Sequence, residues 1–66
     1  MDQRTCYQVT QIALCMGMFT ERTLLNQCKR MCRGNIELVD VQDTIKSMIR
    51  SGMLIRTVGG YIVARR

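Results

Sequence analysis

Apolar side chains recur at helical spacing near the start of the chain. Over 5–16 they follow an i, i+3, i+4, i+7 pattern, at Val9, Ile12, Ala13 and Met16. This spacing is typical of an amphipathic helix with one face turned to a core. Gly17 follows at once, and glycine can leave a helix in a left-handed conformation. We therefore predict a first helix over 5–16 that ends at Gly17.

The next apolar pattern predicts a second helix over 21–33. Thr20 stands before it as the N-cap, because its hydroxyl can accept a backbone N–H that lacks a partner in the first turn. Glu21 complements the helix dipole there, and Gly34-Asn35 ends the helix. Its inner face is apolar, made by Leu24, Leu25, Cys28, Met31 and Cys32. Between the two helices, Met18 and Phe19 form a very short extended segment, which we expect to be exposed.

The stretch "NIELVD" (35–40) is compatible with two structures. Ile36 and Leu38 alternate with polar residues, which fits either a short strand or a loop held by two apolar anchors. In the register that makes 36–38 the small strand, 41–51 is the only helix before the C-terminal segment. Both interpretations place a helix over 41–51, with Asp40 as its N-cap and Asp43 three residues later as in a capping box. Its inner face has Val41, Ile45, Met48 and Ile49.

After Gly52 the pattern changes from helical to extended. "MLIRTV" and "YIVARR" are rich in β-branched residues and are separated by Gly59-Gly60, which is a strong turn signal. A hairpin is marginal in water unless one face is covered, and Leu54, Ile62 and Ala64 are the side chains expected to pack on the helices. With 66 residues, 47% of them apolar, the chain is expected to form a single domain (1–66), mainly α with a small β-hairpin.

Four cysteines in a short chain raise the alternatives of a disulfide framework and a zinc site. Cys6 and Cys15 are nine positions apart on the first predicted helix and face opposite sides, so four sulfurs do not converge. Cys28 and Cys32 do share one helical face, but it is the apolar face, and free cysteine packs as a small hydrophobe. We expect core packing and no metal, with a redox or metal role of Cys28 and Cys32 left open.

The net charge of the chain predicts the kind of partner that it binds. Ten Lys/Arg against five Asp/Glu give a net charge of +5, and such a surplus favours an anionic partner, most often nucleic acid. No apolar run approaches the ~20 residues that span a bilayer. The start "MDQRTCYQ" lacks the apolar centre of a secretory signal. We therefore expect a cytoplasmic protein without a membrane partner.

The segment "DTIKSMIRSGMLIRTVGGYIVAR" resembles the recognition helix and wing of the winged helix-turn-helix superfamily, in particular small bacterial and phage transcriptional regulators. The matching positions are Ile45, Met48, Ile49, Gly52, Met53, Leu54, Gly59, Gly60, Tyr61, Ile62 and Val63. The resemblance implies three helices followed by a two-stranded wing, with 40–51 as recognition helix and 53–65 as wing. The link 34–39 departs from it, being longer than in a compact helix-turn-helix.

The predicted site residues follow from that resemblance and from the placement of the charges. Polar side chains on the outer face of the third helix suit base edges, where Arg pairs with guanine and Gln with adenine: Gln42, Lys46, Ser47 and Arg50. Cations elsewhere are predicted to contact the phosphate backbone: Arg22, Lys29, Arg30, Arg33, Arg56, Arg65 and Arg66. The acids instead stand mainly near predicted helix starts, where capping explains them: Asp2, Glu21, Glu37, Asp40 and Asp43.

The same residues argue against catalysis. Histidine is absent, no Ser or Cys stands beside an obvious base, and "VGGY" lacks the spacing and the Lys of a nucleotide-binding loop. We expect no enzyme and no cofactor. The predicted function is sequence-specific binding of double-stranded DNA in transcription regulation, with a homodimer on paired half-sites as one arrangement. The alternative is a winged-helix module that binds a protein partner and not DNA.

Overall fold

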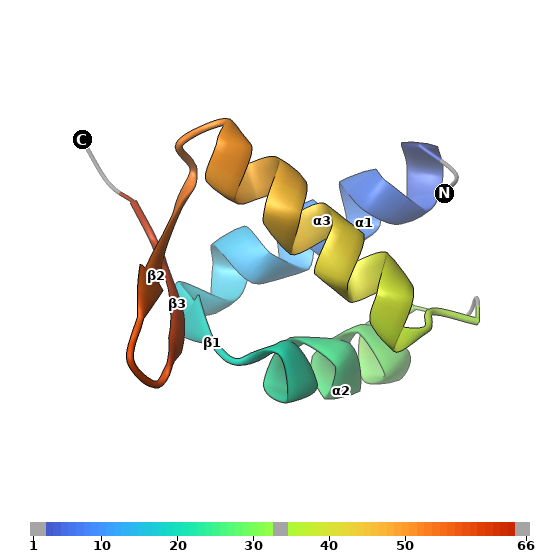
Figure 1. The fold of residues 1–66 in the computed structure, drawn as a ribbon. Coiled ribbons are helices and arrows are strands. Elements are labelled where there is room, and N and C mark those ends of the chain that lie inside the picture. Colours follow the sequence, from blue (N-terminus) through green and yellow to red (C-terminus); the bar gives the residue numbers. More distant parts are fainter. Residues whose placement is uncertain (1–2, 33–34, 65–66) are drawn as a thin grey trace.

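The computed structural model describes residues 3–32 and 35–64, which form three helices and three short strands (Figure 1). The elements are α1 (Gln3–Met16), β1 (Met18–Phe19), α2 (Glu21–Met31), α3 (Leu38–Arg50), β2 (Leu54–Thr57) and β3 (Gly60–Val63). The fold is mainly helical with a small antiparallel sheet, as the pattern predicted. The sheet has three strands and not two, because β1 joins the hairpin.

The ends of α1 and α2 are set by local chemistry. Gly17 has φ +77°, so α1 does end in the predicted left-handed residue. Thr20 caps α2, and the exchange with Thr23 is reciprocal: the Thr23 N–H donates to Thr20 Oγ1 at 3.2 Å, and the Thr20 N–H donates to Thr23 Oγ1 at 2.8 Å. α2 ends at Met31, with Cys32 as its C-cap, two residues before the predicted end.

α3 begins three residues earlier than predicted. Its N-cap is Glu37, whose backbone N–H donates to Asp40 Oδ2 at 3.0 Å. Asp40 therefore lies in the first turn, and the prediction that Asp40 caps a helix starting at Val41 is wrong. The two acids three residues apart that define the capping box are Glu37 and Asp40, not Asp40 and Asp43.

The link before α3 is a loop with one apolar anchor. Ile36 is buried, whereas Leu38 is the first residue of α3 and is exposed. The interpretation of 36–38 as a strand is therefore wrong, and only one of the two expected anchors reaches the core. Burial of Ile36 ties the loop to the helices and so fixes where α3 can begin.

β3 is the central strand of the sheet, in the order β1-β3-β2. β2 and β3 form the predicted hairpin, with Thr57 opposite Gly60 and the turn at Val58-Gly59. β1 pairs on the other side of β3, where Met18 faces Ile62 and Phe19 faces Tyr61. The Val63 N–H also donates to the Gly17 carbonyl oxygen at 2.7 Å. The sheet thus joins the end of α1 to the hairpin.

The two faces of the sheet differ in exposure. One face carries Phe19, which is buried, and Tyr61, whose ring centroid lies 6.0 Å from that of Phe19. The other face carries a row of apolar side chains, one from each strand, that we call the outer row: Met18 (69% exposed), Ile62 (37%) and Ile55 (55%). The expectations that Phe19 is exposed and that Ile62 packs on the helices are wrong, because successive side chains of a strand alternate between its faces. Leu54 is buried as expected.

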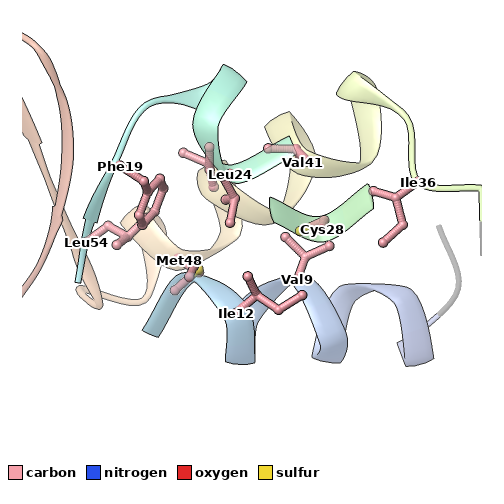
Figure 2. Packing of buried hydrophobic residues seen from close by; sticks show 11 residues of the cluster. Val9, Ile12, Phe19, Leu24, Cys28, Ile36, Val41, Met48 and Leu54 are labelled. Atoms are coloured by element: carbon pink, nitrogen blue, oxygen red, sulfur yellow. The ribbon is translucent and has the colours of Figure 1, made fainter. Parts of the chain in front are cut away.

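The core lies between the helices and the inner face of the sheet (Figure 2). Figure 2 shows Val9 and Ile12 of α1, Leu24 and Cys28 of α2 and Val41 and Met48 of α3 converging, with Phe19 and Leu54 closing the end next to the sheet. The one buried polar residue among those described is Thr44, whose hydroxyl donates to the Asp40 carbonyl oxygen at 2.8 Å. Cys28 packs in the core as expected, but Cys15 is exposed.

Within residues 3–32 and 35–64, none of the helices has the length and apolar character that crossing a membrane requires.

Candidate nucleic-acid interface

The exposed face of α3 is set by the residues on its buried face. Val41, Thr44, Ile45 and Met48 are buried. With about 100° of rotation per residue, the positions diametrically opposite are 39, 43, 46 and 50. All four are exposed, and we call them the outer line of α3: Val39, Asp43, Lys46 and Arg50. Two predicted base-reading residues, Lys46 and Arg50, therefore lie at the centre of the exposed face.

Gln42 lies on the shoulder of α3 and is half-buried. Its Nε2 donates to Glu21 Oε2 at 3.2 Å. The other carboxylate oxygen of Glu21, Oε1, accepts from the Tyr61 hydroxyl at 3.4 Å. One carboxylate at the start of α2 thus holds a side chain of α3 and a side chain of β3. Gln42 serves the packing of these three elements, and it is not a free amide on the outer line.

Ser47 lies on the opposite shoulder of α3 and is exposed. Its carbonyl oxygen accepts from the Ser51 hydroxyl at 2.9 Å and from the Ser51 N–H at 3.0 Å, at the end of the helix. The four predicted base-reading residues therefore fall on three different sides of α3. The structure brings Lys46 and Arg50 together and places Gln42 and Ser47 on either side of them.

Lys46 of α3 and Arg56 of β2 both lie at the junction of α3 and the hairpin. Both line a hollow of about 180 Å³ whose other polar walls are Glu21, Gln42 and Tyr61. Arg56 lies opposite Tyr61 in the register of β2 and β3, so it is on the sheet face that the helices cover. Lys46 and Arg56 are both exposed. Glu21 supplies one negative charge against the two cations Lys46 and Arg56, so the positive charge of this junction is only partly offset.

The predicted backbone-contacting cations of α2 divide between two sides. Arg22, Lys29 and Arg30 are all exposed. Arg22 lines a second hollow, of about 450 Å³, together with Leu38 of α3 and Tyr61 of β3, so it borders the junction. Arg30 follows Thr23 by seven residues, and Thr23 lines a different hollow with Met16 and Met18. At about 100° per residue, Arg30 therefore shares the face of Thr23 and not that of Arg22. Arg33, Arg65 and Arg66 lie outside the described residues.

Sequence reasoning missed the contact of Glu21 with Gln42 and Tyr61, and it missed Val39 as an exposed residue. The signal for the outer line was present in Thr44. A threonine can occupy a buried helical position when its hydroxyl bonds to the carbonyl four residues earlier. Counting Thr44 with Val41, Ile45 and Met48 as the inner face places positions 39, 43, 46 and 50 opposite it.

The cysteines do not add a chemical site to this surface. Among the described residues no group of three or more His, Cys, Asp or Glu side chains is arranged to hold a metal ion. Burial is the main cause that raises the pKa of the Cys28 thiol, and with the smaller effect of the neighbouring Cys32 the pKa reaches about 11. At neutral pH this leaves on the order of one Cys28 in ten thousand as the reactive thiolate.

Thiol reactivity is expected to follow this burial. Cys15 is exposed and should react with a chromogenic disulfide reagent at pH 7, whereas Cys28 should react only after the protein unfolds. Counting modified sulfurs before and after addition of denaturant measures the difference. A Cys28→Ala variant is the control, since it should lose one sulfur from the slow group alone. Loss of a fast sulfur in that variant would contradict the assignment.

The chain matches no protein-family model, no curated protein and no solved structure.

Proposed function

We propose that this protein binds double-stranded DNA as a winged helix, with α3 against the major groove and the β2–β3 hairpin beside it on the backbone. The observation that carries the proposal is the meeting of Lys46 and Arg56 at one hollow between α3 and the hairpin. A helix and a hairpin that present cations to the same hollow can hold one continuous stretch of phosphates. The order β1-β3-β2, with a helix directly before the hairpin, supports the same proposal.

The dimensions of α3 suit a major groove. The outer line extends from Val39 to Arg50, eleven steps or about 16 Å at 1.5 Å per residue, and the groove is about 12 Å wide. Arg50 is the proposed base-reading arginine, since a guanidinium pairs with both acceptors of guanine. Arg22, Lys46 and Arg56 are the proposed phosphate contacts. Gln42 would have to leave Glu21 to reach a base, so we do not count it among the readers.

A gel shift with a labelled duplex of mixed sequence at low salt tests the proposal directly. Arg22, Lys46, Arg50 and Arg56 are the described cations that border the junction or the outer line. The three proposed phosphate contacts, Arg22, Lys46 and Arg56, predict that the logarithm of the affinity falls against the logarithm of salt with a slope of about −3, at roughly −0.9 per contact. A protein that leaves the duplex unshifted at low salt would refute the proposal. Regulation of transcription is the role that we propose for such binding.

Arg56→Ala is expected to weaken binding to all duplex sequences alike and to reduce the salt slope by about 1, because one phosphate contact is removed. Arg30→Ala is the matched control. It makes the same change in charge, but Arg30 lies on the side of α2 that does not border the junction. It should leave the slope unchanged. Fluorescence anisotropy over a salt series measures both variants. An equal loss of slope in the two would mean that only the overall charge of the protein matters.

Binding of a protein partner is the second candidate function, and the outer row supports it. Met18, Ile62 and Ile55 align across all three strands on the side of the sheet that the helices do not cover. Exposed apolar patches of this kind are used in protein contacts. The outer row and the Lys46–Arg56 junction lie on opposite faces of the sheet, so the two functions are compatible. The gel shift decides between protein docking alone and DNA binding.

A further inference from the structure

We propose that Asp43 determines the sequence preference of α3 by accepting a hydrogen bond from the amino group of a cytosine. This inference rests on the proposed binding of duplex DNA and deepens it. Asp43 is exposed and is the one carboxylate on the outer line, between Val39 one turn before it and Lys46 one turn after it. Its place, its charge and its lack of a structural task carry the argument.

The other described acids have structural tasks. Asp40 accepts from the Glu37 N–H and so fixes the start of α3, of which Glu37 is the N-cap. Glu21 accepts from Gln42 and Tyr61. The carboxylate of Asp43, by contrast, has no hydrogen bond and no ion pair with any other described residue. The capping task that the sequence suggested for it belongs to Asp40, so capping does not explain an acid at this position.

Asp43 is also unfavourable for binding DNA through charge alone. A carboxylate beside Lys46 repels phosphate and lowers the attraction that the cations of this face provide. Such a group favours binding only where it meets a hydrogen-bond donor. In the major groove, guanine presents two acceptors and thymine presents an acceptor and a methyl group, whereas cytosine presents the N4 amino donor. Adenine has an amino donor with an acceptor next to it. Cytosine is therefore the base that a carboxylate accepts best.

The spacing along α3 places this contact within one binding site. Asp43 and Lys46 are about 4.5 Å apart along the helix axis at 1.5 Å per residue, close to the 3.4 Å between successive base pairs. Val39 is 52% exposed at the other end of the line. The carboxylate thus lies about one base-pair step from Lys46 along α3, well inside the footprint of the helix.

Selection of bound sequences from a random duplex pool tests the inference. The wild-type protein should select a cytosine at one position of its site. Asp43→Asn should shift that position toward adenine, because an amide pairs with both N6 and N7 of adenine. Asp43→Ala should lose the preference, by roughly 5- to 100-fold in relative affinity. It should also bind a mixed-sequence duplex more tightly than the wild type, since a repulsive charge is gone. If Asp43 were needed only for folding, Asp43→Ala would lower the affinity both for the selected site and for a mixed-sequence duplex.

Gln11→Lys is the charge control. It also raises the net charge by one, on an exposed position of α1, and it should keep the cytosine while strengthening binding generally. Thermal unfolding should be nearly the same for all four proteins, because both positions are exposed. If the wild type selects a site and the two Asp43 variants select the same one, the inference is overturned and DNA binding stands. Binding without any base preference also overturns it. No binding of the wild type to any duplex refutes the proposed function itself.

Discussion

Alanine at Gly60 is expected to separate β3 from β1 and to destabilise the protein by at least about 2 kcal/mol. Gly60 has φ +153°, a conformation that residues with a side chain rarely adopt. A Cβ there would meet the backbone carbonyl oxygen of Phe19 and would lie 3.1 Å from Cγ2 of Thr20. The carbonyl belongs to the backbone and cannot turn aside as a flexible side chain would. The strand must therefore move, and the pairing of Phe19 with Tyr61 is the contact that it loses first.

Gly59→Ala is the matched control for this substitution. Gly59 has open space around the position of a Cβ and no positive φ, so alanine should change the free energy of unfolding by less than about 0.5 kcal/mol. Denaturant unfolding measures both variants, and hydrogen exchange of the Val63 N–H, which donates to Gly17, reports on the β1–β3 side of the sheet. Equal stabilities of the two variants would show that β3 does not approach Phe19 as closely as described.

Alanine at Leu24 is expected to cost about 2–5 kcal/mol, because a fully buried leucine loses its packing and leaves a cavity. A domain of this size is stable by roughly 3–10 kcal/mol in total. The variant should therefore be largely unfolded, or unfold at a much lower temperature than the wild type. Circular dichroism over a temperature series measures the change. In Figure 2 Leu24 lies at the centre of the core, among side chains of the other elements, so all three helices should unfold together.

Leu38→Ala is the control for Leu24→Ala, since it makes the same chemical change at an exposed position of α3. It should cost less than about 1 kcal/mol. A similar loss of stability in the two leucine variants would mean that the core is not where Figure 2 shows it.

The pattern of apolar residues predicted the elements whose signals are local. The apolar spacing of α1, the cap at Thr20 and the Gly-Gly turn of the hairpin each lie within a few residues of the structure that they cause, and all three are confirmed. Such features depend on backbone conformation and on immediate neighbours, so the sequence around them is sufficient.

The start of α3 could not be fixed in the same way. Acids three residues apart occur twice in succession, at Glu37–Asp40 and at Asp40–Asp43, and either pair can form a capping box. The apolar Leu38 and Val39 favoured an extended or buried segment, yet both side chains are exposed on α3. The burial of Ile36 distinguishes the two possible starts of α3. This burial is a property of the assembled core and not of the local sequence.

The composition of the candidate site depends on contacts between distant residues. Glu21 and Gln42 are 21 positions apart, and Glu21 and Tyr61 are 40 apart. No periodicity within one helix shows that a glutamine will be held by a carboxylate from another. The sequence therefore predicted Lys46 and Arg50 on an exposed face, where the helical period alone decides, but it placed Gln42 beside them as an equal.

The position of β3 at the centre of the sheet has a consequence for the order of folding. β1 is made early in synthesis, but its partner residues Tyr61 and Ile62 are made more than forty residues later. Bringing β1 and β3 together closes a long loop, and the entropic cost of that closure comes before the contacts between the two strands can form. The helices can associate first, and the sheet can join them only when the chain has been made as far as Val63. Until then Phe19 has no ring to pack against, and an early product of translation would expose it to chaperones and proteases.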